Sequence, residues 1–359
     1  MNETTKSTRR VIRVSLTVLI FAILVGIFVT GSAVGQQTIS ECQVLDTPNE
    51  IYELDGDIQN QTVETCLDIT ADGVTLDGNG HTVDGVNQTT DSFGVLVNSA
   101  NNVTVKNFGN VTGWQYGIGV GEALNSTLTD NTANRNGEAG ITLLTIDSTL
   151  KNNVVKDNGL NGIGMSGSSN NTLVDNTAMG DQIHGIYLST SDDNKLRENT
   201  ANRNNEAGIY LTQNSISNEL IDNVANRNGI GFEGGPGIYG IWLDDGSNDN
   251  KLTGNEAFDN GLVALEELEE ESSVEGDNIE VNNEVAGPMT AGIYLGGFGE
   301  TAPVFNNTLI DNDARDISVV DGGNQYYGIW LSQASENRLI DNTANENLLY
   351  GIWLSQGSS

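Results

Sequence analysis

The chain of 359 residues carries 49 Asp and Glu against 15 Lys and Arg, which gives a formal net charge of −34. A surface this acidic repels nucleic acid and anionic lipid, so the composition excludes both as partners. It suits concentrated salt, where screening confines the repulsion between carboxylates to a few ångström.

Residues 1–35 have the composition of an export segment. Basic residues precede an apolar run over residues 14–29, and the small residues from Ser32 to Gly35 offer a cleavage site before Gln36. The run is also near the lower limit of about 17 residues for a membrane span, so an uncleaved anchor is the alternative to cleavage. In both cases we expect the remaining chain outside the cell or on its surface. The basic residues, whose central pair resembles a twin-arginine signal, are Lys6, Arg9, Arg10 and Arg13.

Two cysteines, Cys42 and Cys66, follow the export segment. An exported protein can keep a disulfide, and a single pair has one obvious connectivity. The bridge would contribute roughly 3 kcal/mol in the loop-entropy model, whereas two free, buried thiols are the alternative. We predict the disulfide, and we predict that residues 36–66 cap the first coil, because a repeat array needs an atypical unit at its end.

From residue 94 onward, a four-residue phrase, Gly-Ile-x-Leu, returns along the chain. Most copies begin 22 or 23 residues apart, and longer intervals after Gly208 indicate insertions, with a degenerate unit near Val263-Ala264-Leu265. A fixed period in this range indicates a repeat architecture. The copies, of which the first reads Gly-Val-Leu-Val, begin at Gly94, Gly117, Gly140, Gly162, Gly185, Gly208, Gly240, Gly292, Gly328 and Gly351.

Each unit holds apolar runs of three or four alternating residues, which is the pattern of β-strands. A unit this short cannot bury a face alone, but stacked copies can, with equivalent strands parallel and about 4.8 Å apart. The sequence therefore predicts a parallel β-helix. We expect the repeat glycines at corners that need backbone freedom. Asparagines nine positions before a repeat glycine are predicted to form a hydrogen-bonded ladder: Asn131, Asn153, Asn176, Asn199, Asn283 and Asn342.

The stretch from Asp68 to Val83 reads Asp-Ile-Thr-Ala-Asp-Gly-Val-Thr-Leu-Asp-Gly-Asn-Gly-His-Thr-Val. It resembles the first coil of NosD-type proteins and of carbohydrate-binding and sugar-hydrolase (CASH) domains. The resemblance covers residues 67–359 and implies an all-β fold: a right-handed, single-stranded parallel β-helix of about ten to twelve coils. That family includes lyases, hydrolases, epimerases and non-enzymes, so the resemblance implies no single activity.

The acidic profile is similar to that of exported proteins of salt-loving archaea. Calcium binding through acidic loops is the alternative explanation of the charge. We favour salt adaptation, because the acidic residues are scattered along the chain rather than grouped at the spacing of calcium ligands.

The variable position x of Gly-Ile-x-Leu changes character along the chain. It lies on the outer face of the sheet if the alternating Ile and Leu lie inside. Early copies carry small or aliphatic residues there, and later copies carry rings on which sugars could stack, so we predict a carbohydrate-binding strip. An aromatic ladder that only stabilises the sheet, or rings covered by inserted loops, is the alternative. The predicted strip is Tyr187, Tyr210, Trp242, Tyr294, Trp330 and Trp353.

No residues stand out as catalytic, metal-ligating or cofactor-binding. His184 is predicted to face the same side as Tyr187, and His81 is expected in a turn. Asp192 and Asp193 form a carboxylate pair of the kind that glycoside hydrolysis uses, but equivalent turns carry other polar residues, which favours a solvated turn. Two histidines and four methionines give no soft-ligand cluster for copper. We therefore predict no catalytic residue, metal or cofactor.

Sequons of the form Asn-x-Ser/Thr recur in the asparagine-rich repeat. In an exported protein some are expected to carry glycan, which would place them on the surface. The candidates are Asn60, Asn87, Asn102, Asn110, Asn125, Asn170 and Asn306.

The last repeat phrase, at Gly351, is followed by no capping segment. An uncovered coil exposes apolar core and strand edges, so we expect either that this end pairs with a partner or that the open reading frame is truncated. The sequence as a whole predicts an exported, acidic surface protein that binds polysaccharide or another surface glycan, or has a structural role. A polysaccharide lyase or glycoside hydrolase is the second hypothesis, and a NosD-like accessory protein is the third.

Overall fold

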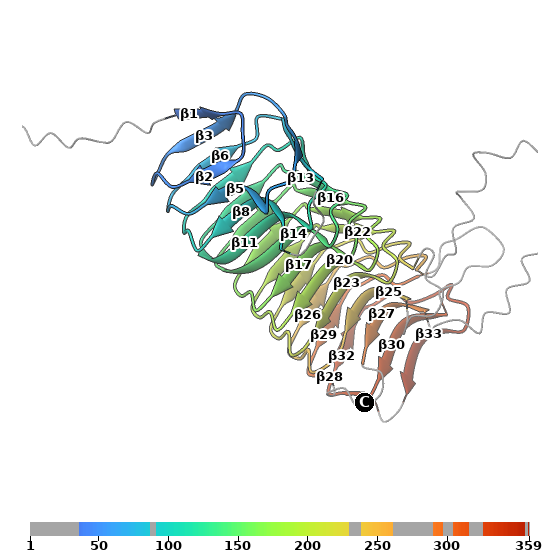
Figure 1. Cartoon of the computed structure of the whole chain (residues 1–359). Helices are drawn as coiled ribbons and strands as arrows, with labels where there is room; N and C mark the ends of the chain where they lie inside the picture. Colours follow the sequence, from blue (N-terminus) through green and yellow to red (C-terminus); the bar gives the residue numbers. More distant parts are fainter. Residues whose placement is uncertain are drawn as a thin grey trace, which may run out of the picture. The chain divides into compact units, whose positions relative to one another are not determined.

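The computed structural model describes residues 36–86, 91–229, 238–260, 290–296, 304–315, 326–355 and 358. Their regular structure consists of β-strands that pair in parallel, coil on coil (Figure 1). Two sheets of twelve strands and one of seven run along the stack. The prediction of an all-β, right-handed parallel β-helix is confirmed, and the twelve strands of each long sheet agree with the predicted ten to twelve coils.

Each sheet collects one strand from successive coils. Sheet A consists of β1 (Gln36–Ile39), β3 (Ile51–Leu54), β6 (Thr75–Asp77), β9 (Thr104–Lys106), β12 (Thr127–Thr129), β15 (Thr149–Lys151), β18 (Thr172–Val174), β21 (Lys195–Arg197), β24 (Glu219–Ile221), β26 (Lys251–Thr253), β29 (Thr308–Ile310) and β32 (Arg338–Ile340). Sheet B, which carries the repeat phrase, consists of β2 (Gln43–Leu45), β5 (Thr65–Ile69), β8 (Phe93–Asn98), β11 (Tyr116–Leu124), β14 (Ala139–Ile146), β17 (Asn161–Ser166), β20 (His184–Ser189), β23 (Ala207–Thr212), β25 (Ile238–Leu243), β27 (Thr290–Leu295), β30 (Tyr327–Ser332) and β33 (Tyr350–Ser355). Sheet C consists of β4 (Ile58–Gln61), β7 (Thr82–Gly85), β10 (Asn110–Thr112), β13 (Thr132–Asn134), β16 (Val154–Lys156), β19 (Thr177–Met179) and β22 (Thr200–Asn202), and β28 (Val304–Phe305) pairs separately with β31 (Ala334–Ser335).

The interior of the stack is a column of aliphatic side chains. In β23, Ile209 and Leu211 are fully buried, and Ile209 is in register with the isoleucines of the neighbouring coils. Strand periodicity places the Ile and Leu of each phrase on the same face, so successive coils bury them against one another. The predicted inward orientation of these residues is confirmed.

Buried asparagines run along the corners of the stack. The predicted ladder between sheets A and C exists: Asn153 Nδ2 donates to Asn176 Oδ1 at 2.9 Å, and Asn176 Nδ2 donates to Asn199 Oδ1 at 3.0 Å. Equivalent ladders occupy the other two corners, for example through Asn194 and Asn204. The residue before each ladder amide takes a left-handed backbone conformation, as at Asp175, which Asn and Asp tolerate well. Asn283 lies outside the described residues.

The prediction that the repeat glycines mark corners is wrong. Gly185 lies within strand β20, and positive φ angles belong to other residues of the coil. Glycine is required there because a Cβ on Gly185 would lie 2.5 Å from Asn204 Nδ2 and 2.8 Å from the carbonyl oxygen of Gly208. The first residue of the phrase is therefore glycine because the backbone there lies too close to the side-chain amide of a ladder asparagine to leave room for a Cβ.

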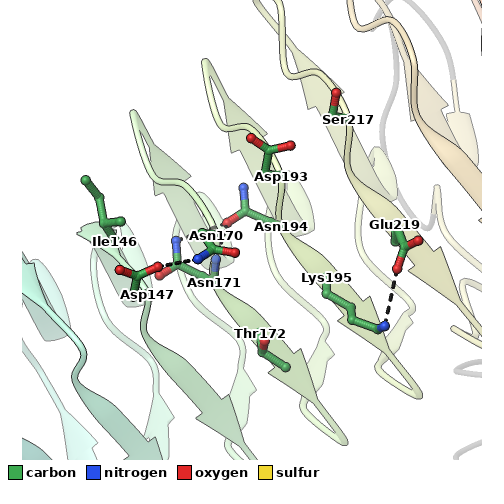
Figure 2. Close-up of a pocket in the computed structure, with 10 residues that line it drawn as sticks. All are labelled: Ile146, Asp147, Asn170, Asn171, Thr172, Asp193, Asn194, Lys195, Ser217 and Glu219. Carbon is green, nitrogen blue, oxygen red and sulfur yellow. Dashed lines mark hydrogen bonds and ion pairs between the residues drawn. The ribbon is translucent and has the colours of Figure 1, made fainter.

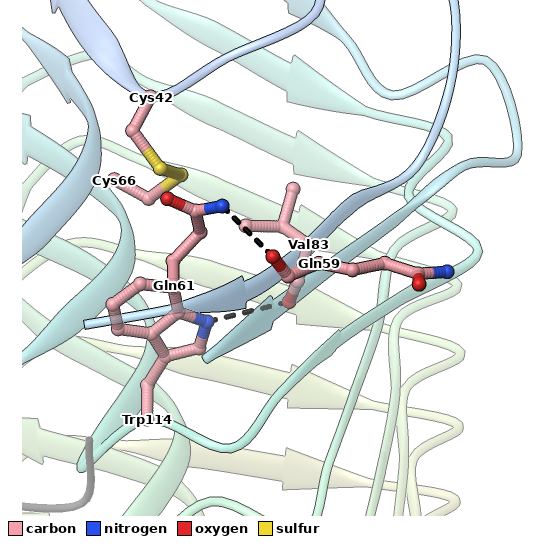
Figure 3. The surroundings of a disulfide bond; sticks show 6 residues. All are labelled: Cys42, Gln59, Gln61, Cys66, Val83 and Trp114. Carbon is pink, nitrogen blue, oxygen red and sulfur yellow. Dashed lines mark hydrogen bonds between the residues drawn. A yellow bond between two sulfur atoms is a disulfide. The ribbon is translucent and has the colours of Figure 1, made fainter. Parts of the chain in front are cut away.

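The predicted cap segment, residues 36–66, contributes β1 and β2, the first strands of sheets A and B. A disulfide joins Cys42 and Cys66, whose Cα atoms are 4.3 Å apart, close to the buried Trp114 (Figure 3). The Trp114 Nε1–H donates to the carbonyl oxygen of Val83 at 3.3 Å. The bridge therefore ties the start of the chain to the first coils of the core.

At the other end, Ile352 and Leu354 of β33 are exposed, although their equivalents in β30 are buried. Pairing of this end with a partner stays a prediction. The export segment and the degenerate strand near residues 263–265 lie outside the described residues. Within the described ranges, no helix has the length and hydropathy needed to cross a membrane.

Candidate active site on sheet B

The rings of the later coils form a second apolar cluster on the outer face of sheet B. Register places Tyr210, Trp242 and Tyr294 side by side, and the ring centroids of Tyr210 and Trp242 are 4.1 Å apart. This cluster is separate from the interior column of Ile and Leu, which confirms that the x position faces away from the core. Its other members include Tyr239 and Tyr327.

The rings do not form the exposed strip that the sequence suggested. Trp242 is 4% exposed, Tyr294 0% and Trp330 2%. The indole N–H of Trp242 donates to the carbonyl oxygen of Gly296 at 3.2 Å, and that of Trp330 donates to Ser355 Oγ at 3.0 Å. The expectation of outward, solvent-facing rings is therefore wrong for these three, which pack against one another and against Tyr239 and Tyr327. Tyr187, Tyr210 and Trp353 stay half-buried.

A polar cluster adjoins this aromatic face at strands β20 and β23. His184 opens β20, and its ring lies 5.6 Å from that of Tyr187 and 4.7 Å from that of Tyr210, centroid to centroid, so it faces the predicted side. Its Nε2 lies 3.8 Å from Oε2 of Glu206, which directly precedes β23. His184 is 6% exposed and Glu206 is 8% exposed.

Burial sets the protonation of this pair. It lowers the pKa of His184 to about 3, so the imidazole is neutral at neutral pH. Burial, and after it the charge of Asp244, raises the pKa of Glu206 to about 7. The His184 Nδ1 is buried without a hydrogen-bond partner among the described residues, so it is available to a group that enters the site.

A second buried carboxyl group completes the cluster. Asp244 follows β25 directly and is 5% exposed. The Tyr210 hydroxyl donates to both of its carboxylate oxygens at 3.0 Å. Burial raises the pKa of Asp244 to about 6, although bonds from Thr212 and Tyr210 lower it. We call His184, Glu206, Tyr210 and Asp244 the polar cluster.

Two carboxyl groups whose pKa values are raised into the neutral range are typical of acid–base sites. Sequence analysis missed Glu206 and Asp244 because they lie just outside the repeat phrase. The signal was present in the columns on either side of it, since Asp244 occupies the outward position that Thr212 occupies in the preceding coil. Among the described residues, no three His, Cys, Asp or Glu side chains lie close enough to hold a metal ion together.

The other residues considered from sequence lie elsewhere. His81 stands in the turn before β7, with Nδ1 3.4 Å from Asp57 Oδ1, which agrees with the expected turn role. Asp192 accepts a hydrogen bond from the backbone N–H of Ile216 at 2.9 Å, and Asp193 is an exposed left-handed corner residue. The solvated-turn interpretation of this pair is confirmed.

Four of the predicted glycosylation sites share one corner of the stack. They lie between sheets B and A, are exposed, and have left-handed backbone conformations: Asn102, Asn125, Asn170 and Asn306. Neighbours touch along this column, since Asn125 Nδ2 donates to Asn102 Oδ1 at 2.7 Å. Asn60 is exposed and Asn110 is half-buried, whereas Asn87 lies outside the described residues.

The same corner carries a surface groove of about 700 Å³ (Figure 2). Inside it, Lys195 Nζ and Glu219 Oε2 form an ion pair at 3.2 Å, and both side chains are close to half exposed. Charged groups that are solvated and paired with each other offer little to a reaction, so we place the candidate site on sheet B. The groove is lined by Ile146, Asp147, Asn170, Asn171, Thr172, Asp193, Asn194, Lys195, Ser217 and Glu219.

A family model described as "Right handed beta helix region" matches residues 25–182, 94–257 and 237–359. The chain belongs to this right-handed β-helix family. Comparison with curated protein sequences finds no relative. The NosD-type resemblance stays a prediction.

Two solved structures are similar to this β-helix protein at low identity. The DFA-IIIase from Arthrobacter chlorophenolicus A6, in complex with DFA-III, has a TM-score of 0.60 at 11% identity, covering 87% of this chain and 84% of that chain. The A-module of the Azotobacter vinelandii mannuronan C-5 epimerase AlgE4 has a TM-score of 0.52 at 16% identity, covering 90% and 86%. At these identities the similarity shows a shared fold.

Proposed function

We propose that the protein is an exported β-helix enzyme that cleaves a glycosidic bond of a polysaccharide at the polar cluster on sheet B. The observation that carries the proposal is the pair of buried carboxyl groups, Glu206 and Asp244, with raised pKa values beside a neutral imidazole. The fold supports the ligand class, since a mannuronan C-5 epimerase shares it. The half-buried Tyr187 and Tyr210 supply ring surface for a sugar at the site.

The two carboxyl groups have complementary roles in this proposal. Glu206, with a pKa of about 7, is partly protonated at neutral pH and can donate its proton to the glycosidic oxygen. Asp244, with a pKa of about 6 and a hydrogen bond from Tyr210, is mostly ionised and can stabilise positive charge that develops on the sugar ring. A water molecule then adds to the anomeric carbon in place of the departing glycosidic oxygen and gives its proton to Asp244. His184 positions the Glu206 carboxyl group through the 3.8 Å contact.

The test is the release of reducing or unsaturated ends from a panel of polysaccharides by the purified full chain in concentrated salt. We expect Glu206→Gln to lower turnover at least a hundredfold, because removal of a general acid removes a 10²–10⁴-fold contribution. The matched control is Glu198→Gln, which changes an exposed corner carboxylate and should leave turnover unchanged. Absence of both turnover and binding across the panel would contradict the proposal.

A structural surface role is the second candidate. The buried packing of Trp242, Tyr294 and Trp330 favours it, because these rings stabilise the outer face of the sheet whether or not a ligand binds. The two roles separate experimentally: loss of a buried ring lowers stability, whereas Glu206→Gln lowers turnover without lowering stability, because it removes a carboxyl group whose pKa burial has raised.

Export and glycosylation complete the proposal. The basic and apolar segment of residues 1–35 supports export. The exposed column that contains Asn102, Asn125, Asn170 and Asn306 supports glycan on the corner between sheets B and A. Mass spectrometry of the native protein tests both points, through the mature N-terminus and the occupancy of each sequon.

A further inference from the structure

The basic residues of the β-helix are distributed unevenly over its three sheets. Residues 36–359 contain eleven Lys and Arg, which is the total of 15 less the four in residues 1–35. All eleven belong to the described residues, and the strands of sheet B, as described, contain none of them. Six lie on strands of sheet A: Lys106, Lys151, Lys195, Arg197, Lys251 and Arg338. The other five lie on sheet C or at the corners and bridges that continue it: Arg135, Lys156, Arg203, Arg227 and Arg315.

The polar cluster therefore lies on the one sheet without a basic residue. Burial and the negative charge of Asp244 raise the pKa of Glu206. The negative charge of Asp245 acts in the same direction on the pKa of Asp244. The imidazole of His184 is neutral. A ligand that brought carboxylate or sulfate groups here would meet like charges without a cation to balance them.

Concentrated salt does not remove this conflict. Screening by dissolved ions acts on exposed charges, but buried pairs are screened much less. Asp244, which is mostly ionised, is more than nine-tenths buried, so its repulsion of an anionic sugar persists at the ionic strength that the acidic surface suits. Abstraction of a proton next to a sugar carboxylate would also need a cation or several donors to hold the developing negative charge.

We infer that the ligand of the polar cluster is an uncharged sugar polymer, and that polyuronates and sulfated glycans are rejected. This inference rests on the proposed function, which requires only that some polysaccharide is cleaved. Tyr187 and Tyr210 offer apolar ring faces, and these stack on uncharged sugars without a charge partner. The site is therefore expected to bind uncharged polysaccharides and to reject negatively charged ones.

The experiment compares polymers of matched linkage that differ only at C6, namely β-1,4-mannan with β-1,4-polymannuronate, and β-1,4-glucan with β-1,4-polyglucuronate. Binding to the full chain is measured by calorimetry in concentrated salt, and turnover by the release of sugar ends. We expect at least one uncharged member to bind at least tenfold more tightly than its uronate counterpart, and to be the member that is cleaved.

A designed variant sharpens the comparison. Ser166 is exposed at the end of β17, in register with Ser189 of β20, so Ser166→Lys places a cation on sheet B, one coil before His184, where a polymer bound along the sheet would extend. It should raise affinity for the uronate several-fold and leave affinity for the uncharged partner unchanged, and Ser166→Gln is the matched uncharged control.

The outcomes separate the two claims. Preferred binding or cleavage of the uronates by the unmodified protein overturns the inference and leaves the proposed function standing. If no member of any pair binds or is cleaved, the proposed function falls and this inference falls with it. Equal affinity for both members of each pair also overturns the inference, because charge would then play no part in selection.

Discussion

Asp181 occupies a ladder position that the coils on either side fill with asparagine, Asn158 and Asn204, and its replacement by asparagine should stabilise the protein. Its Oδ1 accepts hydrogen bonds from the backbone N–H and Nδ2 of Asn158 at 2.9 and 3.0 Å. Its Oδ2 is buried without a hydrogen-bond partner among the described residues. In the next coil the equivalent atom, Asn204 Nδ2, donates to Asn228 Oδ1 at 3.1 Å, so an ionised Asp181 puts an acceptor where the ladder needs a donor.

The magnitude follows from the buried position of this carboxyl group. Burial raises the pKa of Asp181 from 3.8 to about 8. Between these two values the folded protein holds a proton that the unfolded chain has released, so stability falls as the pH rises through that window. At pH 7 the accumulated loss is about 4 kcal/mol, from about 1.4 kcal/mol per pH unit over roughly three units. Asp181→Asn removes this loss, and its amide adds about 1 kcal/mol through the restored bond.

Denaturant unfolding at constant salt, between pH 5 and pH 8, measures the effect. The free energy of unfolding of Asp181→Asn should exceed that of the unmodified protein by an amount that grows by about 1.4 kcal/mol per pH unit. Asp193→Asn, which changes an exposed corner residue, should have no effect at any pH. Asn199→Asp, in another ladder, should destabilise increasingly as the pH rises. A difference for Asp181→Asn that is independent of pH would refute the reasoning.

Three further substitutions test the packing of the coils. Gly185→Ala should lower the free energy of unfolding by about 1–3 kcal/mol, because its Cβ would lie 2.5 Å from a ladder amide; Gly56→Ala, which meets nothing within 4 Å, is the control. Trp330→Ala should cost about 3–5 kcal/mol in thermal or denaturant unfolding, because the ring is buried, and a cost below about 1 kcal/mol would restore the exposed-ring interpretation. Replacing both Cys42 and Cys66 by Ser should cost about 3 kcal/mol, and an unchanged stability would show that the bridge contributes nothing.

The fold was predictable because its determinants repeat. Each repeat unit contains both the Ile and Leu of the interior and an asparagine of the ladder. Every copy of the phrase therefore predicts the same coil of a parallel β-helix. The reason for the repeat glycines was not predictable, since the atoms that exclude a Cβ at Gly185 belong to the next coil. Glycine is usually explained by a positive φ angle, which is common at corners, and this led to the wrong prediction that the repeat glycines lie at corners.

The candidate site was predictable only in part. The x position correctly placed Tyr210 and its neighbours on the outer face of sheet B. Their burial depends on rings in an adjacent column, such as Tyr239, which the phrase does not include. Glu206 and Asp244 flank the phrase in different coils, so the approach of Glu206 to His184 and of Asp244 to Tyr210 appears only once the register of the coils is known.

A crystal structure of the Glu206→Gln variant, soaked with an oligosaccharide of the polymer that the unmodified protein cleaves, would show whether a sugar polymer reacts at the polar cluster on sheet B. We expect the sugar to contact Tyr187 and Tyr210, with a glycosidic oxygen within hydrogen-bond distance of the side chain at position 206. A sugar bound instead in the groove beside Lys195 and Glu219, with the polar cluster unchanged, would contradict this expectation.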